Sequence, residues 1–399
     1  MSCDELPGGD MKQIITTEKR PIKLWLDDID DGAMGQARNL ANLPFVYKHI
    51  AVMPDAHLGY GMPIGGVMAT EDVVIPNAVG VDIGCGMCAL QTSLTDISND
   101  QLKAIIKIIR RTIPLGFKHH KARQSKALMP KTEIPLEELP LVSQEYNSAL
   151  TQLGTLGGGN HFIEIQKGSD GHIWIMIHSG SRNLGFKVAN YYNRLAVQLN
   201  ARWGSTIPGN WQLAFLPLSS EAGRQYVHEM NYCVEFALAN RKLMMERVKE
   251  AFRAVASPVS FSSFINIAHN YAAMETHFHK QVIVHRKGAT SAREGEMGII
   301  PGSQGTPSYI VRGKGNSESF ESCSHGAGRK MGRKQAQRQL DLEAEVKKLD
   351  NQGIIHSIRG RRDLDEAAGA YKNIDQVIEN QIDLVEVVVT LHPLAVIKG

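Results

Sequence analysis

The fold is decided by the stretch HIAVMPDAHLGYGMPIGGVMAT (residues 49–70) together with VVIPNAVGVDIGCGM (residues 73–87). Short apolar runs alternate here with Gly and Pro, a pattern typical of buried strands joined by tight loops. The last part also carries a carboxylate and a thiol, Asp82 and Cys85, among apolar neighbours. Glycine beside such groups lets the backbone turn sharply and lets a bulky anion approach closely. We predict strands that end in a polar site.

The same pattern of apolar runs beside small residues returns in four segments farther along the chain. Each segment places a histidine in or at the end of an apolar run, next to Gly, Asn or Ser. The segments are GGGNHFIE (157–164), MIHSGSR (176–182), IAHNY (267–271) and CSHGAGR (323–329). Buried strands often finish in this way. The histidines are His161, His178, His269 and His325, and we expect one polar site assembled from these distant segments.

The remaining sequence predicts an α/β (α+β) fold. Residues 163–178 read as a hairpin around a turn at 168–171. Ser98 can cap a helix whose apolar positions follow a helical period. Further helices are expected at about 186–202, 221–255 and 329–349, and a surface loop or lid at 116–140. Because glycine-rich functional loops lie on both sides of the long helices, we expect a single domain over 1–399, with a loose lead at 1–14 and a helical insertion at about 186–255.

Composition limits the class of protein. A chain of 399 residues with 43% hydrophobic content can bury a large core. The formal charge of +3 is too small by itself to indicate nucleic acid. Basic clusters at 118–123 and 329–338 can bind phosphates, but such clusters are as often solvated faces. No apolar run reaches the length needed to span a membrane, and the first 13 residues contain no apolar stretch, so we expect neither a membrane segment nor a signal peptide.

The five cysteines are too few and too irregularly spaced for a disulfide framework. Cys85 and Cys88 form a single C-x-x-C without the second pair that a zinc ribbon requires. We therefore expect a reducing, cytoplasmic location, with Cys85 as a metal ligand and Cys88 in the core.

Asp82, Cys85 and the histidines are suited to binding metal ions. An ionised Asp82 among apolar residues needs a partner, although a hydrogen-bonded structural aspartate would also satisfy it. A single histidine on an apolar strand is usually a satisfied core residue, but two paired across a hairpin can face one point. Three imidazoles, a carboxylate and a thiolate exceed what one tetrahedral ion needs. Two neighbouring ions bridged by Cys85 would use all five, and Mn²⁺ and Zn²⁺ both fit this donor set.

PGSQG (301–305) and HGAG (325–328) supply small residues whose backbone N–H groups can cradle a phosphate or a base. Neither is a Walker loop or a dinucleotide-binding fingerprint. An imidazole nitrogen of His325 can attack phosphorus, or the residue can serve as a further metal ligand or a loop histidine. Asp55 and His57 are candidates for groups that orient the ligands from behind.

Taken together, these motifs resemble the RtcB family of GTP- and manganese-dependent RNA ligases. The likeness runs from ITTEKRPIK at residue 15 to the terminal VIKG and is carried by GVDIGCGM, LGTLGGGNHFIE, HSGSR, HNY, RKGATSAR, IIPGSQG and SCSHGAGR. It implies mixed sheets around a central dinuclear metal cleft. It also implies an enzyme of tRNA splicing or RNA repair that joins an RNA 3′-phosphate or 2′,3′-cyclic phosphate to a 5′-hydroxyl. GTP and two Mn²⁺ ions would be the cofactors, RNA the substrate, and an activating protein a possible partner.

The resemblance assigns roles by motif. His325 corresponds to the histidine that becomes guanylylated, passing GMP to the RNA 3′-phosphate before the 5′-hydroxyl seals the strand. The metal ligands would be Asp82, Cys85, His161, His178 and His269. The guanosine site would be drawn from Asn160, His161, Phe162, Ile163, Glu164, His269, Asn270, Pro301, Gly302, Ser303, Gln304, Ser308, His325, Gly326, Ala327, Gly328, Tyr371 and Lys398.

Basic residues near these motifs are candidates for binding RNA phosphates, with a solvated surface role as the alternative for each. They are Arg182, Arg286, Lys287, Arg293 and Arg312. The stretch 113–140 departs from the family pattern, which puts substrate choice in doubt. Two other functions remain open: a paralogue that caps 3′-phosphate ends with GMP without sealing them, and a metal-dependent phosphohydrolase without a covalent intermediate.

Overall fold

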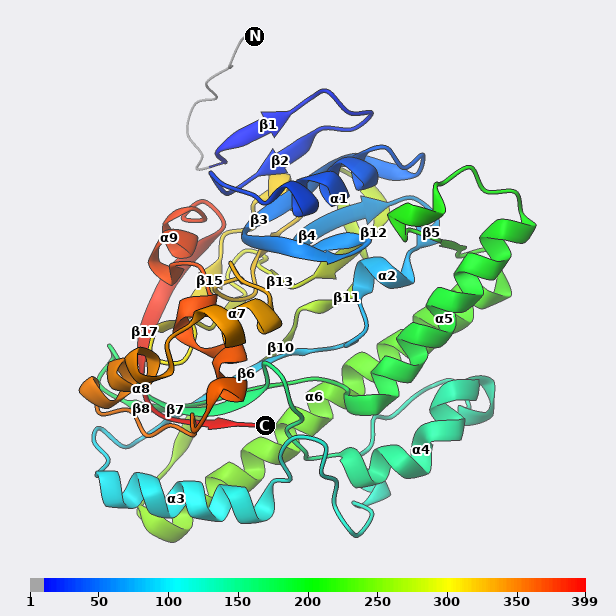
Figure 1. The fold of residues 1–399 in the computed structure, drawn as a ribbon. Coiled ribbons are helices and arrows are strands. Elements are labelled where there is room, and N and C mark those ends of the chain that lie inside the picture. Colours follow the sequence, from blue (N-terminus) through cyan, green and yellow to red (C-terminus); the bar gives the residue numbers. More distant parts are fainter. Residues whose placement is uncertain (1–10) are drawn as a thin grey trace.

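The stretch 49–70 forms the two longest strands of a six-stranded sheet, as its alternation of apolar runs and glycine predicts. A computed structural model describes residues 11–399 (Figure 1). The sheet has the order β1-β2-β3-β4-β12-β11, and β2 and β3 are its parallel pair. Its strands are β1 (Gln13–Ile15), β2 (Ile22–Leu24), β3 (Val46–Tyr60), β4 (Met62–Thr70), β11 (Asn270–His277) and β12 (Lys280–Lys287).

A second sheet of seven antiparallel strands has the order β10-β6-β8-β7-β17-β15-β14. Its edge strand β14 packs against β10 and β6 at the other end, so the sheet curls into a nearly closed barrel. Apolar side chains such as Met87, Trp174 and Ile310 cluster together on this sheet. The strands are β6 (Gly86–Thr92), β7 (Phe162–Gly168), β8 (Ile173–Ser179), β10 (Phe261–Ala268), β14 (Met297–Ile300), β15 (Ser308–Gly313) and β17 (Val385–Lys398).

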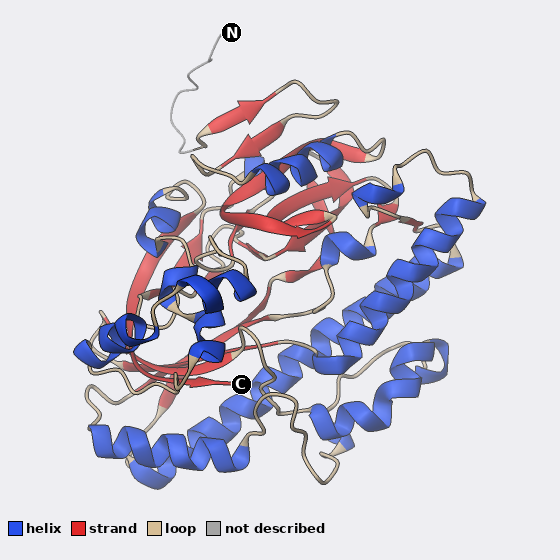
Figure 2. Ribbon diagram, viewed as in Figure 1, coloured by secondary structure: helices blue, strands red, loops and turns tan. Residues whose placement is uncertain are grey.

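Two short strand pairs and a set of helices surround the sheets (Figure 2). The pairs are β5 (Val73–Val74) with β9 (Leu216–Pro217), and β13 (Ala289–Ser291) with β16 (Ser322–Ser324). The helices are α1 (Asp31–Ala41), α2 (Pro76–Val79), α3 (Asn99–Thr112), α4 (Pro140–Gln152), α5 (Arg182–Arg202), α6 (Glu221–Val255), α7 (Arg333–Gln339), α8 (Leu342–Asn351) and α9 (Ile374–Glu379).

Helix α6 runs diagonally beneath the seven-stranded sheet (Figure 1). It packs against β6, β8 and β10, and its buried Met244, Val248 and Phe252 share one core cluster with strand residues. Buried Asn240 accepts hydrogen bonds from Gly154 N (2.7 Å) and Thr155 N (3.1 Å) in the loop before β7. The helical segment expected as an insertion therefore shares the core of the sheet and braces loops that lead to the site.

The structure corrects several boundaries. The charged helix expected at 329–349 is two helices, because Asp341 accepts a hydrogen bond from Ala344 N (2.7 Å) and so caps a new helix, α8. Helix α5 begins at Arg182, four residues before the expected start. Strand β1 begins within the expected loose lead, of which residues 1–10 lie outside the described part. The expected loop at 116–140 contains the 3₁₀ turns η1 (Lys126–Leu128) and η2 (Leu136–Glu138).

Other expectations are confirmed. The fold is mixed α and β, and the hairpin at 163–178 is formed by β7 and β8. Ser98 caps α3 in a capping box with Gln101. Cys88 lies in the core, and Cys85, Cys88, Cys233 and Cys323 are free thiols, whereas Cys3 lies outside the described residues. Among the helices of residues 11–399, none is long and apolar enough to cross a membrane.

Candidate functional site

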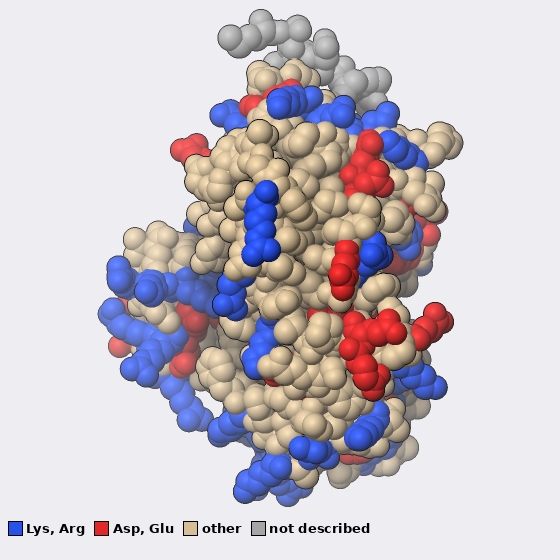
Figure 3. All heavy atoms as spheres, turned by 90° about the vertical axis from the view of Figure 1, so that its right-hand side faces the viewer, with Lys and Arg blue, Asp and Glu red and all other residues tan. Residues whose placement is uncertain are grey.

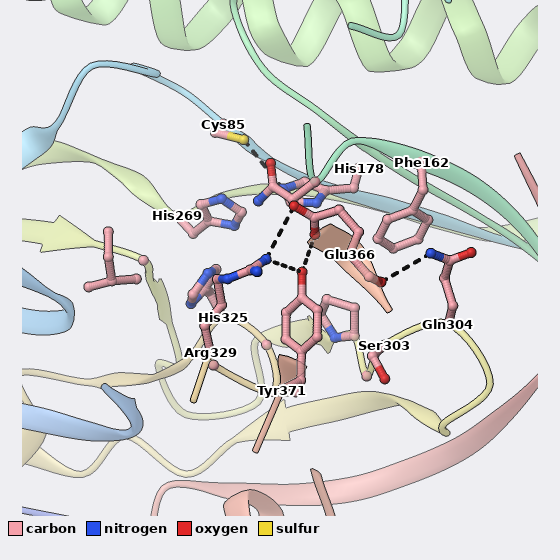
Figure 4. A pocket seen from close by; sticks show the side chains of 18 of the residues that line it. Cys85, Phe162, His178, His269, Ser303, Gln304, His325, Arg329, Glu366 and Tyr371 are labelled. Carbon is pink, nitrogen blue, oxygen red and sulfur yellow. Dashed lines mark hydrogen bonds and ion pairs between the residues drawn. The ribbon is translucent and has the colours of Figure 1, made fainter. Parts of the chain in front are cut away.

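The candidate site is a cavity of about 360 Å³ between the two sheets (Figure 4). His269 lies at the crossing, since β10 of the seven-stranded sheet ends at Ala268 and β11 of the six-stranded sheet begins at Asn270. Most of the residues that the motifs single out line the cavity. They are Asp82, Cys85, Asn160, Phe162, Glu164, His178, His269, Asn270, Pro301, Gly302, Ser303, Gln304, His325, Gly326, Ala327, Gly328, Tyr371 and Lys398.

The five predicted metal-binding side chains lie next to one another. Cys85 Sγ is 3.3 Å from both His161 Nε2 and His178 Nε2, and these three donor atoms lie within 4.8 Å of each other. On one side, Asp82 Oδ2 is 3.2 Å from His161 Nε2. On the other side, the His178 and His269 rings have centroids 5.2 Å apart. The donors therefore form a continuous cluster with Cys85 in the middle.

Strand register explains this convergence. In the antiparallel pairs of the second sheet, Met87 is opposite His178, and His178 is opposite Phe162. Consequently the start of β6, the end of β8 and the start of β7 meet at one edge of the sheet. The backbone N–H of His269 donates to Cys85 O (2.8 Å), which fixes the fourth segment at the same point. Glycine is needed beside this cluster, because a Cβ on Gly180 would lie 2.2 Å from Asp82 Oδ1.

The cluster is suited to hold a cation. His161 Nδ1 lies 3.0 Å from Leu156 O, which can only accept a hydrogen bond, so Nδ1 donates and Nε2 is the nitrogen that faces the cluster. Burial and neighbouring imidazoles lower the pKa of His178 and His269 well below the usual range, so both rings are neutral at pH 7. Burial and then the Asp82 charge raise the pKa of the Cys85 thiol. This mixed O/N/S set matches transition-metal chemistry.

His325 stands next to the cluster, with its ring centroid 4.7 Å from that of His269. Its Nδ1 lies 2.6 Å from Asp55 Oδ2, which also accepts from the His325 backbone N–H (3.2 Å). Asp55 is fully buried in β3. Burial would raise the pKa of this carboxyl, but the His325 imidazole outweighs burial and lowers it. Because Asp55 occupies Nδ1, Nε2 is the ring nitrogen available for chemistry.

The loop after His325 packs tightly on β3. Gly328 has φ +72°, and a Cβ there would lie 2.2 Å from Asp55 O. Only glycine permits this backbone geometry and approach. The HGAG motif thus brings His325 and Asp55 together. His57, two residues beyond Asp55, also lines the cavity, and burial lowers its pKa to about 4.

The cavity also holds a polar cluster around Glu366, a residue that no sequence motif indicates. Glu366 accepts from the Tyr371 hydroxyl, from Arg329 Nη1 (3.2 Å) and from Arg333 Nε (3.1 Å). The Arg329 guanidinium also lies over the Tyr371 ring, 5.1 Å from its centroid. Glu366 lies in the 3₁₀ segment η5 (Arg361–Glu366), between unremarkable residues. Two features of the sequence could have pointed to Glu366: the basic run at 329–338 and the nearby Tyr371.

Two further residues that line this cavity stand out, one by a shifted pKa and one by a polar atom without a hydrogen-bond partner. Burial raises the pKa of Glu164 to about 8. Gln304 Nε2 donates to Glu366 O (3.0 Å), but its buried Oε1 has no partner among the described residues. An unpartnered buried acceptor is costly, and a donor on a bound molecule would satisfy it.

The remaining predicted residues lie outside the cavity lining. Ile163 is buried in the core, and Ser308 Oγ accepts from Gly302 N (3.1 Å). Arg286 is fully buried and is bound by Glu275, so it offers no surface to RNA and is withdrawn as a contact. Lys287 is also buried, donating to Tyr60 O (2.6 Å) and Asn77 O (2.9 Å).

The other three basic candidates each have a partner. Arg182 Nε donates to Thr155 Oγ1 (3.3 Å). Arg293 and Arg312 are about half exposed and pair with carboxylates, Arg293 with Glu275 and Arg312 with Glu386, each at 3.3 Å. Surface pairs of this kind leave their charge accessible to a phosphate.

Comparison with known proteins adds a family to this geometry. The family model described as tRNA-splicing ligase RtcB matches residues 36–139 and 125–399. The RNA-splicing ligase RtcB of Escherichia coli is 39% identical, over 97% of this chain and 99% of that protein. The tRNA-splicing ligase RtcB of Thermococcus kodakarensis is 34% identical over 99% and 97%. The RNA-splicing ligase RtcB of Mycobacterium tuberculosis is 33% identical over 91% and 100%.

Proposed function

The chain belongs to the RtcB family and is an RNA ligase of splicing or repair, and from this premise we propose how its site works. It joins an RNA 3′-phosphate or 2′,3′-cyclic phosphate end to a 5′-hydroxyl end through a covalent His325–GMP intermediate. One observation carries the proposal. His325, fixed by buried Asp55, stands directly beside the metal-competent cluster, so a nucleophile and a cation site share one cavity.

Asp82, Cys85, His161, His178 and His269 would hold two Mn²⁺ ions. The central position of Cys85, 3.3 Å from both His161 and His178, supports a bridging role. Asp82 flanks the cluster on the His161 side and His269 on the His178 side, so both ends of the cluster would supply ligands to bound metal. When bound, the ions would neutralise phosphate charge and orient the leaving group.

GTP would occupy the part of the cavity between His325 and the Glu366 cluster. The free Gln304 Oε1 offers an acceptor to an N–H of the base. Backbone N–H groups in the loops 301–304 and 325–328 can cradle phosphates, and Tyr371 presents its ring at the wall. Lys398 also lines the cavity, with its Nζ 5.6 Å from the centre of the Phe162 ring. The RNA contacts proposed from the sequence reduce to Arg182, Arg293 and Arg312.

On a 3′-phosphate end the reaction proceeds by three displacements at phosphorus, whereas a 2′,3′-cyclic phosphate would first be opened by water to a 3′-phosphate. His325 Nε2 attacks the α-phosphorus of GTP, forming an N–P bond while the bond to pyrophosphate breaks. Asp55 holds Nδ1–H and stabilises the charged ring. An oxygen of the RNA 3′-phosphate then displaces His325 and takes the GMP. Finally, the RNA 5′-hydroxyl attacks the 3′-phosphate, the strand is joined, and GMP leaves.

Product analysis separates this function from its two alternatives. RNA with a 3′-phosphate is incubated with 5′-hydroxyl RNA, GTP and Mn²⁺, and the products are resolved. We expect a joined strand. A GMP-capped 3′ end without joining would instead mark a capping enzyme, and GTP-independent loss of phosphate a phosphohydrolase. His325→Asn should abolish joining, whereas His279→Asn, at an exposed turn, is the matched control.

Two finer points belong to the same proposal. The four described free thiols support a reducing, cytoplasmic location. The joining assay, repeated with purified protein alone and with cell extract, decides whether an activating protein partner is needed.

A further inference from the structure

A second groove, with a volume of about 1130 Å³, opens beside the catalytic cavity. The two share lining residues, among them His57, Asp82 and Arg329, so the groove leads directly into the cavity. None of the roles proposed above uses the rest of the groove, which is bordered by the end of β3 and by α7.

One wall of the groove is basic. Lys334 and Arg338 are exposed and lie one turn apart on α7, which places them on the same face of the helix. Lys330, Arg329 and Arg333 continue this wall toward the cavity. The acidic residues lining the groove are Asp30 and Asp82. Figure 3 shows Lys and Arg gathered on the projecting part at the left of the view, which corresponds to the front of Figure 1, where α7 lies.

The other wall exposes apolar side chains. Tyr60 is 70% exposed, Leu58 57% and Val81 46%, and all three line the groove. Tyr60 makes no ring contact within residues 11–399, yet its backbone is fixed. Buried Lys287 donates to Tyr60 O, and Gly61, with φ +71°, turns the chain behind it. A flat ring is therefore held out on a strand end, in a groove that a row of cations also lines.

We propose that this groove binds an unpaired RNA strand leading to the end being joined, with a base stacked on Tyr60 and phosphates along Lys330, Lys334 and Arg338. The inference rests on the proposed RNA ligase function and adds its substrate track. Aromatic rings opposite a cationic row suit single-stranded nucleic acid, because every base has a stacking face and every nucleotide a phosphate. An acidic peptide would use the same cations but would not need the ring.

The test measures binding of a short fluorescent RNA with hydroxyls at both ends, which cannot react, in the absence of GTP. Tyr60→Ala should weaken binding about tenfold, and Tyr60→Phe should keep it, because stacking needs only the ring. The double variant Lys334→Ala/Arg338→Ala should make the plot of the logarithm of the RNA association constant against the logarithm of salt concentration less steep, by about 0.7 for each lost phosphate contact. Tyr60→Ala should leave this slope unchanged. Annealing the RNA to its complement should remove the effect of Tyr60→Ala.

Matched controls lie on other faces. Tyr191→Ala on α5 and Lys103→Ala/Lys107→Ala on α3 should bind RNA as wild type does. All groove variants should still accept GMP from GTP at the wild-type rate, since none touches His325 or the metal cluster. The proposal would be overturned if Tyr60→Ala bound RNA as tightly as wild type. It would also be overturned if the charge variants lost binding of an acidic peptide but kept their binding of RNA. Failure of the proposed function would look different: wild type would not take up GMP at all.

Discussion

At the scale of single residues, the site depends on the hydrogen bond between Asp55 and His325. Asp55 is buried, and its Oδ1 has no partner among the described residues, so its principal contact is with the imidazole. This bond sets the tautomer and orientation of His325, and it would stabilise the ring in the proposed covalent intermediate. Asp55 is therefore a positioning residue rather than a ligand.

Replacing Asp55 by Asn tests this role. The amide keeps the shape but loses the charge, so the rate of GMP transfer to His325 should fall about 10- to 100-fold. The dissociation constant for GTP should stay near that of wild type, because Asp55 does not line the cavity. Single-turnover labelling and equilibrium binding separate the two quantities. An unchanged transfer rate would show that His325 does not need this partner.

Cys85 is the second residue on which the site depends, because its thiol lies in the middle of the five donor groups. If it bridges two ions, Cys85→Ala should lose both Mn²⁺ ions, whereas His269→Ala should lose only one. Cys88→Ala removes a core thiol three residues away and should keep the metal content of wild type. Metal analysis after dialysis gives the stoichiometry. Retention of one tightly bound ion by Cys85→Ala would argue against a bridge.

At the scale of elements, a helix or strand is predicted correctly when the interactions that determine it join residues close to one another in the sequence. The hairpin of β7 and β8, the Ser98 cap of α3 and the start of α6 depend on neighbouring residues, and the sequence predicts them. The prediction of one charged helix at 329–349 is wrong. The composition favours a helix throughout this stretch, but the cap at Asp341 starts a new one. Arg286 was misjudged for a related reason. Its partner Glu275 lies across the β11–β12 pair, and a basic residue in a polar motif looks exposed from sequence alone.

The pair between β11 and β12 makes stability depend on pH. Burial would raise the pKa of Glu275, but buried Arg286 and the neighbouring His277 lower it from 4.5 to about 2. The native state thus favours the ionised carboxylate. Its stabilisation is fully present above about pH 4.5 and is lost as pH falls toward about 2, on the order of 3 kcal/mol.

Glu275→Gln should therefore destabilise the protein at pH 7 by about 3–5 kcal/mol, because it leaves the Arg286 charge buried and unpaired. The difference from wild type should shrink as pH falls from about 4.5 to about 2. Denaturant unfolding across this range measures it. Glu386→Gln breaks only a surface pair with Arg312 and should cost less than about 1 kcal/mol. A pH-independent difference would mean that Glu275 is not the titrating group.

At the scale of the whole molecule, the site exists only where the two sheets meet. The metal donors come mainly from one edge of the seven-stranded sheet, Asp55 comes from β3 of the other sheet, and His269 is the residue between them. Sequence motifs identify the members of this site because each needs small neighbours and a strand end. They do not identify Glu366 or the groove at Tyr60, since these join the site only through the packing of distant segments.

The central claim is that His325 becomes covalently attached to GMP in a reaction that needs the metal cluster. The most direct measurement is incubation with Mn²⁺ and GTP labelled on its α-phosphate, followed by denaturing electrophoresis and mapping of the labelled peptide. We expect acid-labile label on the peptide that contains His325, absent from His325→Asn and lost when a chelator removes the metal. A wild-type protein that stays unlabelled, or a His325→Asn variant labelled as strongly as wild type, would contradict it.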